Sequence, residues 1–106
     1  MTGPAASNDN SAQTTSAALV REVEIVNKKG LHARASAKFV QIAEQYDANI
    51  KVTRGNETVG GTSIMGLMML AASPGTKITI AVTGNEAEAA LNALCGLVAG
   101  RFGEDD

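Results

Sequence analysis

The spacing of apolar residues along the chain constrains its fold more than any other feature of the sequence. Alternating apolar and polar residues predict a first strand in residues 19–27, two strands in 48–61 and a fourth in 77–83. Apolar residues spaced three or four apart predict a helix after each of the first, third and fourth strands. The resulting order, β-α-β-β-α-β-α, predicts an α+β fold in which a four-stranded antiparallel sheet carries three helices on one face.

The turns between these segments support the same order. The first strand places Val23 and Ile25 on one face and is expected to end near Asn27. The pair Gly55-Asn56 tolerates the positive φ of a tight hairpin, so the second and third strands are expected to be antiparallel neighbours. The stretch SPGT predicts a type II turn ahead of the fourth strand.

Each predicted helix presents one apolar stripe to the sheet. Leu67 and Leu70 define this stripe in the short second helix, and Asn85 is the expected N-cap of the last helix. The first helix is expected to bury Ala35, Phe39, Ile42 or Ala43, and Tyr46. The last helix is expected to bury Ala87, Leu91, Leu94, Val98 and Phe102, and the fourth strand Ile78, Ile80 and Val82.

A chain of 106 residues suits one compact domain. We expect residues 19–102 to form that domain, residues 1–18 to be a disordered tail poor in large apolar side chains, and residues 103–106 to be an acidic C-terminal tail. The net charge is −2, and the aromatic residues are two phenylalanines and one tyrosine. Neither nucleic acid nor an anionic membrane is therefore an expected partner.

The lone cysteine, Cys95, excludes an intrachain disulfide and fits a reducing compartment. Its place beside the apolar stripe of the last helix predicts a buried and inert thiol. The N-terminus has neither the basic start nor the apolar centre of a secretory signal, and no apolar run approaches the length of a membrane span. We therefore expect a cytoplasmic protein without membrane insertion.

The only histidine, His32, lies in the stretch GLHARASAKF, between a glycine turn and the start of the first helix. The first N–H groups of a helix lack intrahelical partners, and the helix dipole adds roughly half a positive charge there. Such a position binds anions, and Arg34 can add a planar fork of hydrogen bonds to phosphate oxygens. A neutral imidazole is nucleophilic, so the pattern fits a histidine that accepts and releases a phosphoryl group.

Other roles for His32 stay open at this level, and the simplest is a plain helix cap. A zinc site is disfavoured, because the usual ligand set needs several histidines or cysteines and the chain has one of each. A nucleophile pair of His32 with Cys95 is disfavoured by the expected burial of the thiol. The chain has no glycine-rich P-loop motif, so a phosphoryl group would come from another protein, and no metal or cofactor is expected.

The stretch GLHARASAKFV, followed by Ser63 in GGTSIMGLMMLAASPGT, resembles HPr, the histidine phosphocarrier family of the bacterial phosphotransferase system. The resemblance spans about residues 19–102 and implies an HPr-like fold of the order given above. It implies that His32 takes a phosphoryl group on Nδ1 from enzyme I, itself charged by phosphoenolpyruvate, and passes it to IIA-type proteins. It further implies that Arg34 stabilises the phosphate and that Ser63 is phosphorylated by an HPr kinase/phosphorylase where the host has one.

Two features depart from the family pattern. Many relatives have proline where Ala35 stands, which affects the stiffness of the first helical turn rather than the chemistry. Gln41 and Glu44 occupy the exposed face of the first helix, where sugar-transport members tend to have lysines that dock acidic IIA proteins. This difference favours the regulatory, nitrogen-related branch of the system over sugar uptake.

Three methionines, Met65, Met68 and Met69, fall close together in the second helix. One explanation is core filling, for which methionine is well suited. If the leucines of this helix face the core, however, the methionines lie on its other faces and form an apolar surface that adapts to several partners. The resemblance implies contact with enzyme I at Ile64 and Met65. We therefore predict a docking surface made of Ile64, Met65, Met68 and Met69.

Three alternative functions are consistent with this sequence. The first is a phosphoryl carrier, which is a transferase-type relay component rather than a free-standing enzyme. The second is a regulatory binding module of the same fold that acts through its Ser63-phosphorylated form, and the presence of both His32 and Arg34 argues against it as the sole role. The third is an unrelated α+β ligand-binding domain in which His32 is only a cap. A carrier that presents one small face to successive partners is expected to be a monomer.

Overall fold

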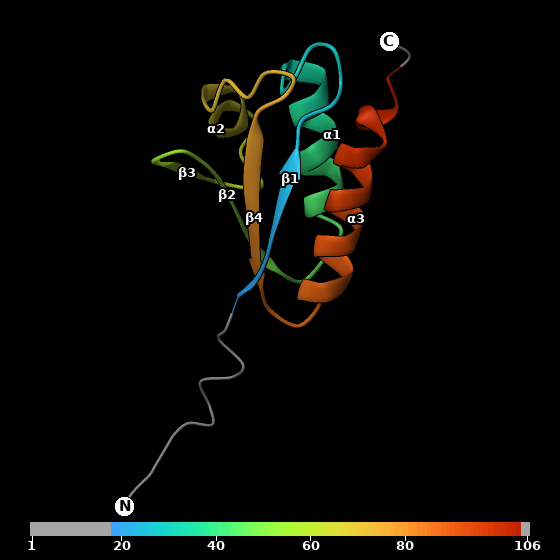
Figure 1. The fold of residues 1–106 in the computed structure, drawn as a ribbon. Coiled ribbons are helices and arrows are strands. Elements are labelled where there is room, and N and C mark those ends of the chain that lie inside the picture. Colours follow the sequence, from blue (N-terminus) through green and yellow to red (C-terminus); the bar gives the residue numbers. More distant parts are fainter. Residues whose placement is uncertain (1–17, 105–106) are drawn as a thin grey trace, which may run out of the picture.

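The computed structural model describes residues 18–104, so most of the expected N-terminal tail and residues 105 and 106 lie outside the described part. The elements are β1 (Leu19–Glu24), α1 (Ala33–Ala43), β2 (Asn49–Arg54), β3 (Glu57–Gly60), α2 (Ile64–Met69), β4 (Lys77–Thr83) and α3 (Ala87–Ala99), followed by the 3-10 turn η2 (Arg101–Gly103). This order confirms the predicted fold class (Figure 1).

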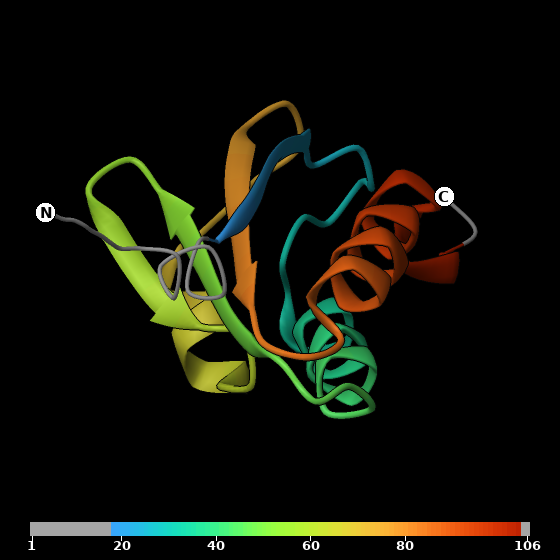
Figure 2. The same ribbon diagram turned by 90° about the horizontal axis from the view of Figure 1, so that it is seen from below.

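The strands form one antiparallel sheet in the spatial order β1-β4-β2-β3. β4 comes last in the sequence but lies inside the sheet, where Ile80 faces Arg21 of β1 on one side and Val52 of β2 on the other. The predicted hairpin at Gly55 joins β2 to β3, with Arg54 paired to Glu57. All the α-helices lie on the same face of this sheet, as expected (Figure 2).

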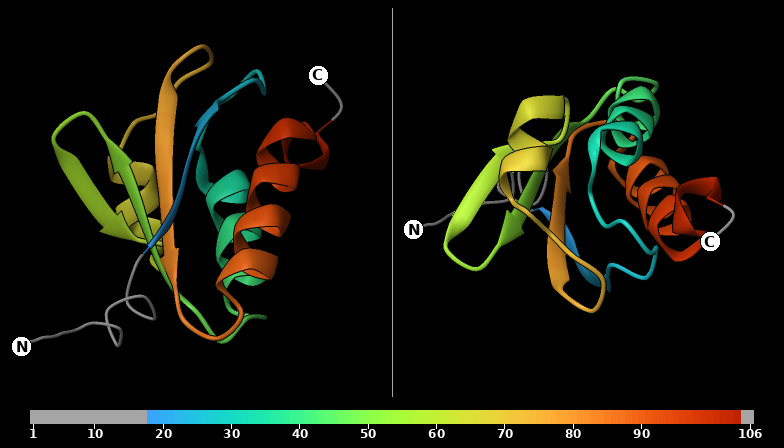
Figure 3. Two further views of the ribbon diagram at one scale, coloured as in Figure 1. Left: turned by 60° about the horizontal axis from the view of Figure 1, so that its bottom comes forward. Right: turned by 90° about the horizontal axis from the view of Figure 1, so that it is seen from above.

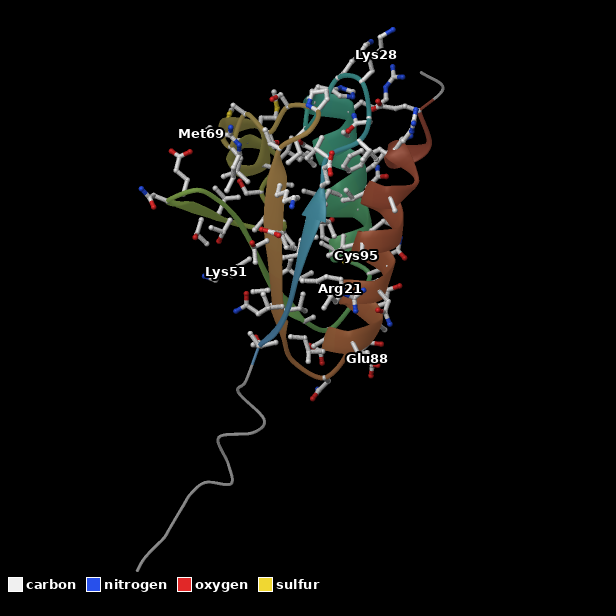
Figure 4. The ribbon with its side chains drawn as sticks, in the orientation of Figure 1. Arg21, Lys28, Lys51, Met69, Glu88 and Cys95 are labelled. Atoms are coloured by element: carbon white, nitrogen blue, oxygen red, sulfur yellow. The ribbon has the colours of Figure 1, made fainter. Side chains whose placement is uncertain are left out.

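The core fills the space between the sheet and the helices. The predicted stripes are buried there except for Tyr46, which is only partly buried. Of the two alternatives in α1, Ala43 is the buried residue and Ile42 is only partly buried. Cys95 is buried on α3, as predicted, and lies toward the middle of the helix (Figure 4). The largest fully buried apolar side chains are Phe39, Phe102, Ile25, Leu67, Leu70, Ile78, Ile80, Leu94, Val52, Val82 and Val98. Each stabilises the fold by about 1.5–3 kcal/mol relative to an exposed position.

Two predicted boundaries extend too far. β1 ends at Glu24 rather than near Asn27, because Ile25 pairs with a turn and not with a strand: its N–H donates to the Thr76 carbonyl at 2.9 Å. That turn has the type II features expected of SPGT, with φ of 89° at Gly75. α1 ends at Ala43, so Tyr46 lies beyond the helix and packs against the core from the following loop.

Asn85 is not the N-cap of α3, which corrects the sequence prediction. The N-cap position belongs to Glu86, whose side chain makes no cap hydrogen bond. Asn85 Nδ2 instead donates to Asp47 Oδ2 at 2.9 Å, and Glu86 Oε1 accepts from the Asp47 N–H at 2.7 Å. Both side chains therefore tie the start of α3 to the loop after α1. No helix within residues 18–104 combines the length and apolar character that crossing a bilayer requires.

Candidate functional site

A glycine turn fixes the direction in which the chain enters α1. Gly30 has a φ of 65°, and a Cβ added there would lie 2.3 Å from the carbonyl oxygen of Ala72. Both the left-handed backbone and the close approach require glycine at this position. The next residue, Leu31, donates its N–H to the same Ala72 oxygen at 3.0 Å and buries its side chain. The turn thereby places His32 at the N-cap position of α1.

His32 caps α1 through its backbone only. Its φ and ψ are −75° and −177°, and its carbonyl oxygen accepts the first helical hydrogen bond from the Ser36 N–H at 2.9 Å. Its side chain makes no cap hydrogen bond, and 28% of that side chain is exposed. The imidazole is therefore not used as a cap, although His32 directly precedes the N–H groups that a helix leaves without intrahelical partners.

An open hollow surrounds the imidazole at this end of the molecule. The hollow brings together His32 and Arg34, the two residues predicted to act on phosphate. Cationic side chains dominate its walls, which are lined by Lys29, His32, Ala33, Arg34, Lys38, Gly103 and Glu104. Positive side chains and the positive end of a helix dipole both favour an anion at this position.

Two members of the site, Glu104 and Asn27, were missed by sequence reasoning. Glu104 Oε2 lies 2.5 Å from His32 Nε2, and Glu104 Oε1 accepts a hydrogen bond from Asn27 Nδ2 at 3.0 Å. Glu104 falls within residues 103–106, which the sequence predicts to be an acidic C-terminal tail, yet only 13% of its side chain is exposed and it contacts Asn27 in the loop before α1. The bend after α3 brings it beside the loop that precedes α1 (Figure 3). No local pattern in the sequence signals this contact, because the partners are 72 positions apart.

Ser63 and the methionines lie outside this hollow, on α2. Ser63 is the N-cap of α2, and its Oγ accepts a hydrogen bond from the Gly66 N–H at 2.9 Å. The buried leucines and exposed methionines confirm the predicted orientation of this helix. The exposed fractions are 41% for Ile64, 69% for Met65, 40% for Met68 and 67% for Met69. Met69 and the loop that carries Lys28 lie toward the same end of the molecule (Figure 4).

The segment after α2 connects this apolar surface to the histidine. A second, smaller hollow is lined by Lys29, Leu31 and His32 from the start of α1 and the loop before it, and by Ala71, Ala72 and Ser73 from the segment after α2. Ala71 has a φ of 51°, a left-handed conformation that few non-glycine residues adopt. The chain that leaves α2 therefore passes directly beside His32.

The alternative chemistries weighed for His32 gain no support from its surroundings. Cys95 is absent from both hollows that His32 lines, and it is buried on α3. Within residues 18–104, no three His, Cys, Asp or Glu side chains gather as a metal site would require.

The chain is thus an antiparallel α+β sandwich that presents one histidine at a helix start. Residues 19–100 match the family profile described as the PTS HPr component phosphorylation site. The chain is 49% identical over 88 residues to the phosphocarrier protein HPr of Neisseria meningitidis, covering 83% of this chain and 99% of that relative. The chain belongs to the HPr family of phosphocarrier proteins of the phosphotransferase system, which confirms the resemblance seen in the sequence.

A second relative and a solved structure support the same family assignment. The chain is 43% identical over 86 residues to the phosphocarrier protein NPr of Shewanella violacea, covering 81% of this chain and 94% of that one. A crystal structure of an HPr from Thermoanaerobacter tengcongensis matches with a TM-score of 0.79 at 40% identity, and covers 83% of this chain and 99% of its own. The fold and the sequence therefore lead to the same family.

Proposed function

We propose that this protein accepts a phosphoryl group on His32 from enzyme I charged by phosphoenolpyruvate, and passes it to IIA-type proteins. The observation that carries the proposal is the placement of His32: its backbone caps α1 while its ring stands in the cationic hollow. A phosphoryl group on this ring would meet the first N–H groups of α1 and the guanidinium of Arg34, which offers charge-assisted hydrogen bonds.

The experiment that tests the proposal is phosphorylation of the purified chain with enzyme I and phosphoenolpyruvate. Phosphohistidine is labile in acid, whereas phosphoserine is stable, so acid treatment reports which residue carries the phosphate. We expect acid-labile phosphate on the wild type and on Ser63→Ala, and none on His32→Ala. Acid-labile phosphate on His32→Ala would contradict the assignment, because the chain has no second histidine.

The exposed surface of Ile64, Met65, Met68 and Met69 is proposed as the docking surface for these protein partners. An apolar patch of this kind loses water favourably on contact, and methionine adapts its shape to different partners. The patch lies on α2, and the chain that follows α2 borders His32. A partner seated on α2 can therefore reach the histidine without a large movement of this protein.

Phosphorylation of Ser63 is proposed as the regulatory event, carried out by an HPr kinase/phosphorylase where the host has one. Ser63 begins α2 and directly precedes Ile64 of the docking surface. A phosphate there would bring roughly −1.5 to −2 charges to the edge of an apolar contact. This would weaken the docking of enzyme I while the helix itself tolerates the charge. The alternative role, a regulatory module that acts through phosphorylated Ser63, would use the same position.

The remaining proposals concern the setting in which the carrier works. We propose that it acts as a cytoplasmic monomer, without cofactor, metal, nucleic acid or membrane insertion. The exposed positions of Gln41 on α1 and of Glu44 at its C-cap support assignment to the regulatory, nitrogen-related branch, because acidic IIA proteins would find no lysine at either position. Phosphotransfer from this carrier to purified IIA proteins of each branch would distinguish the two.

A further inference from the structure

We propose that Glu104 is a positioning residue for His32, which it holds so that Nδ1 is the nitrogen free to take a phosphoryl group. The inference rests on the proposed function and deepens it. His32 Nε2 lies 2.5 Å from Glu104 Oε2. An ionised carboxylate can only accept a hydrogen bond, so Nε2 must carry the proton. The neutral ring then keeps its lone pair on Nδ1.

Asn27 holds the second oxygen of Glu104. Its Nδ2 donates to Glu104 Oε1 at 3.0 Å and to the Gly30 carbonyl oxygen at 2.8 Å. Because both neighbours are acceptors, the amide can be oriented in one way only. Asn27 is fully buried, and its Oδ1 has no hydrogen-bond partner within residues 18–104. A buried amide with an unpaired oxygen costs stability, which points to a role beyond packing.

The turn that delivers Glu104 is strained. Its φ angles are 60° at Arg101, 56° at Phe102 and 72° at Gly103, and two of these residues are not glycine. Such backbone persists only where the surroundings impose it, and it gathers at functional sites. Here the Phe102 side chain is fully buried, and Lys38 Nζ donates to the Phe102 carbonyl oxygen at 2.7 Å. The fold therefore maintains an unfavourable conformation that carries Glu104 back to His32.

The arrangement has a direct consequence for phosphoryl transfer. As Nδ1 attacks phosphorus, the Nδ1–P bond forms, the bond from phosphorus to the donor atom breaks, and its electron pair stays on the donor. No proton has to leave His32, because Nδ1 begins unprotonated and Nε2 keeps its hydrogen. The ring gains positive charge, and the Glu104 carboxylate stabilises that charge, as a buried aspartate does for the imidazolium of a serine protease.

The tautomer of His32 tests the proposal without any phosphate. Because the chain has a single histidine, a long-range ¹H–¹⁵N spectrum of the labelled full chain assigns both ring nitrogens without ambiguity. At a pH where the ring is neutral, we expect the proton on Nε2 in the wild type and a mixture of tautomers in Glu104→Ala. The matched control, Glu88→Ala, removes the same charge at the far end of α3 and should leave the spectrum unchanged (Figure 4). A wild-type proton on Nδ1, or identical spectra of wild type and Glu104→Ala, would overturn the proposal.

The rate of phosphorylation provides the second readout. Two donors are used: enzyme I with phosphoenolpyruvate, and phosphoramidate, a small molecule that needs no docking surface. Glu104→Ala should slow both reactions by about 10- to 100-fold, the loss expected for a hydrogen bond to a charged group. Glu104→Asp should recover part of the rate, and Glu88→Ala should match the wild type. Unchanged or faster transfer in Glu104→Ala, or a loss of thermal stability alone, would overturn the positioning role. A wild type that takes no phosphate from enzyme I would instead contradict the proposed function, and the tautomer measurement would still decide the role of Glu104.

Discussion

Lys38 on α1 and Phe102 in η2 are joined by a hydrogen bond of 2.7 Å from the Lys38 Nζ to the Phe102 carbonyl oxygen. The bond ties the turn after α3 to the helix that begins at the histidine. Lys38 also lines the hollow around His32. One side chain therefore both anchors the turn that carries Glu104 and adds positive charge to the site.

Replacing Lys38 by Met is expected to lower the free energy of unfolding by about 1 kcal/mol, the usual net contribution of a hydrogen bond. Methionine keeps most of the apolar stem, so the loss reports the ammonium group rather than packing. Urea denaturation measures the change. Lys51→Met is the control, because Lys51 is exposed on β2, and it should leave the midpoint unchanged. An equal midpoint for both variants would show that the Lys38 bond does not hold the turn.

Arg34→Ala is expected to slow transfer from enzyme I more than it destabilises the fold. Arg34 is exposed, so its removal opens no cavity, whereas a charge-assisted contact to phosphate contributes roughly 1.5–3 kcal/mol. Single-turnover phosphorylation and thermal melting are compared on the same samples. Lys51→Ala, which removes one positive charge outside the hollow, should transfer at the normal rate. Normal transfer in Arg34→Ala would show that the N–H groups of α1 suffice.

Ser63→Asp is expected to melt within a few degrees of the wild type yet accept phosphate from enzyme I much more slowly. Aspartate is a good N-cap and can replace the bond that Ser63 Oγ accepts from the Gly66 N–H. A negative charge at a helix start stabilises by about 0.3–1 kcal/mol, but stripping water from it at an interface costs several kcal/mol.

Ser63→Ala separates the cap from the charge. It removes the cap bond, at a cost of about 1 kcal/mol, and adds no charge to the docking surface. We expect it to melt lower than Ser63→Asp and to accept phosphate at close to the normal rate. Normal transfer in Ser63→Asp would place the docking surface elsewhere, and slow transfer in both variants would implicate the cap rather than the charge.

Gly30→Ala is expected to destabilise the protein more than Gly55→Ala, although both glycines have nearly the same φ, 65° and 61°. Each substitution places a Cβ on left-handed backbone, at about 1–2 kcal/mol. At Gly55 nothing lies within 4 Å of that Cβ, whereas at Gly30 it would lie 2.3 Å from the Ala72 oxygen. The forced shift should add about 1–3 kcal/mol. Urea denaturation of both variants checks the difference, and equal losses would show that the turn at Gly30 relaxes freely.

The order of strands and helices could be predicted from the sequence because its causes are local. The alternation of Ile78, Ile80 and Val82 on β4 requires only that successive strand residues point to opposite faces, and each is buried. The placement of His32 and Arg34 in one hollow has the same origin, because the two residues are neighbours at one helix start. The exposure of Met65 could be predicted in the same way, because Leu67 and Leu70 face the core and Met65 lies on another face of the same short helix.

Boundaries and caps depend on contacts that the local pattern does not contain. Ile25 continues the alternation of β1, yet its hydrogen-bond partners belong to the turn before β4, so the strand ends at Glu24. Asn85 has the side chain of a good N-cap, but Asp47 offers it another partner. In both cases a segment far along the chain competes with the local preference, and the tertiary contact prevails.

The sequence by itself determined the family, the fold class and the histidine at the start of α1. Only the tertiary structure decided how that histidine is held. Glu104 follows two non-glycine residues with positive φ, a conformation that no local propensity favours and that the buried Phe102 imposes. Asn27 looks like an ordinary turn residue until the fold buries it between Gly30 and Glu104. The contacts of Glu104 with Asn27 and His32 join residues more than 70 positions apart, and they form only when packing of the core brings the turn after α3 beside the loop that precedes α1.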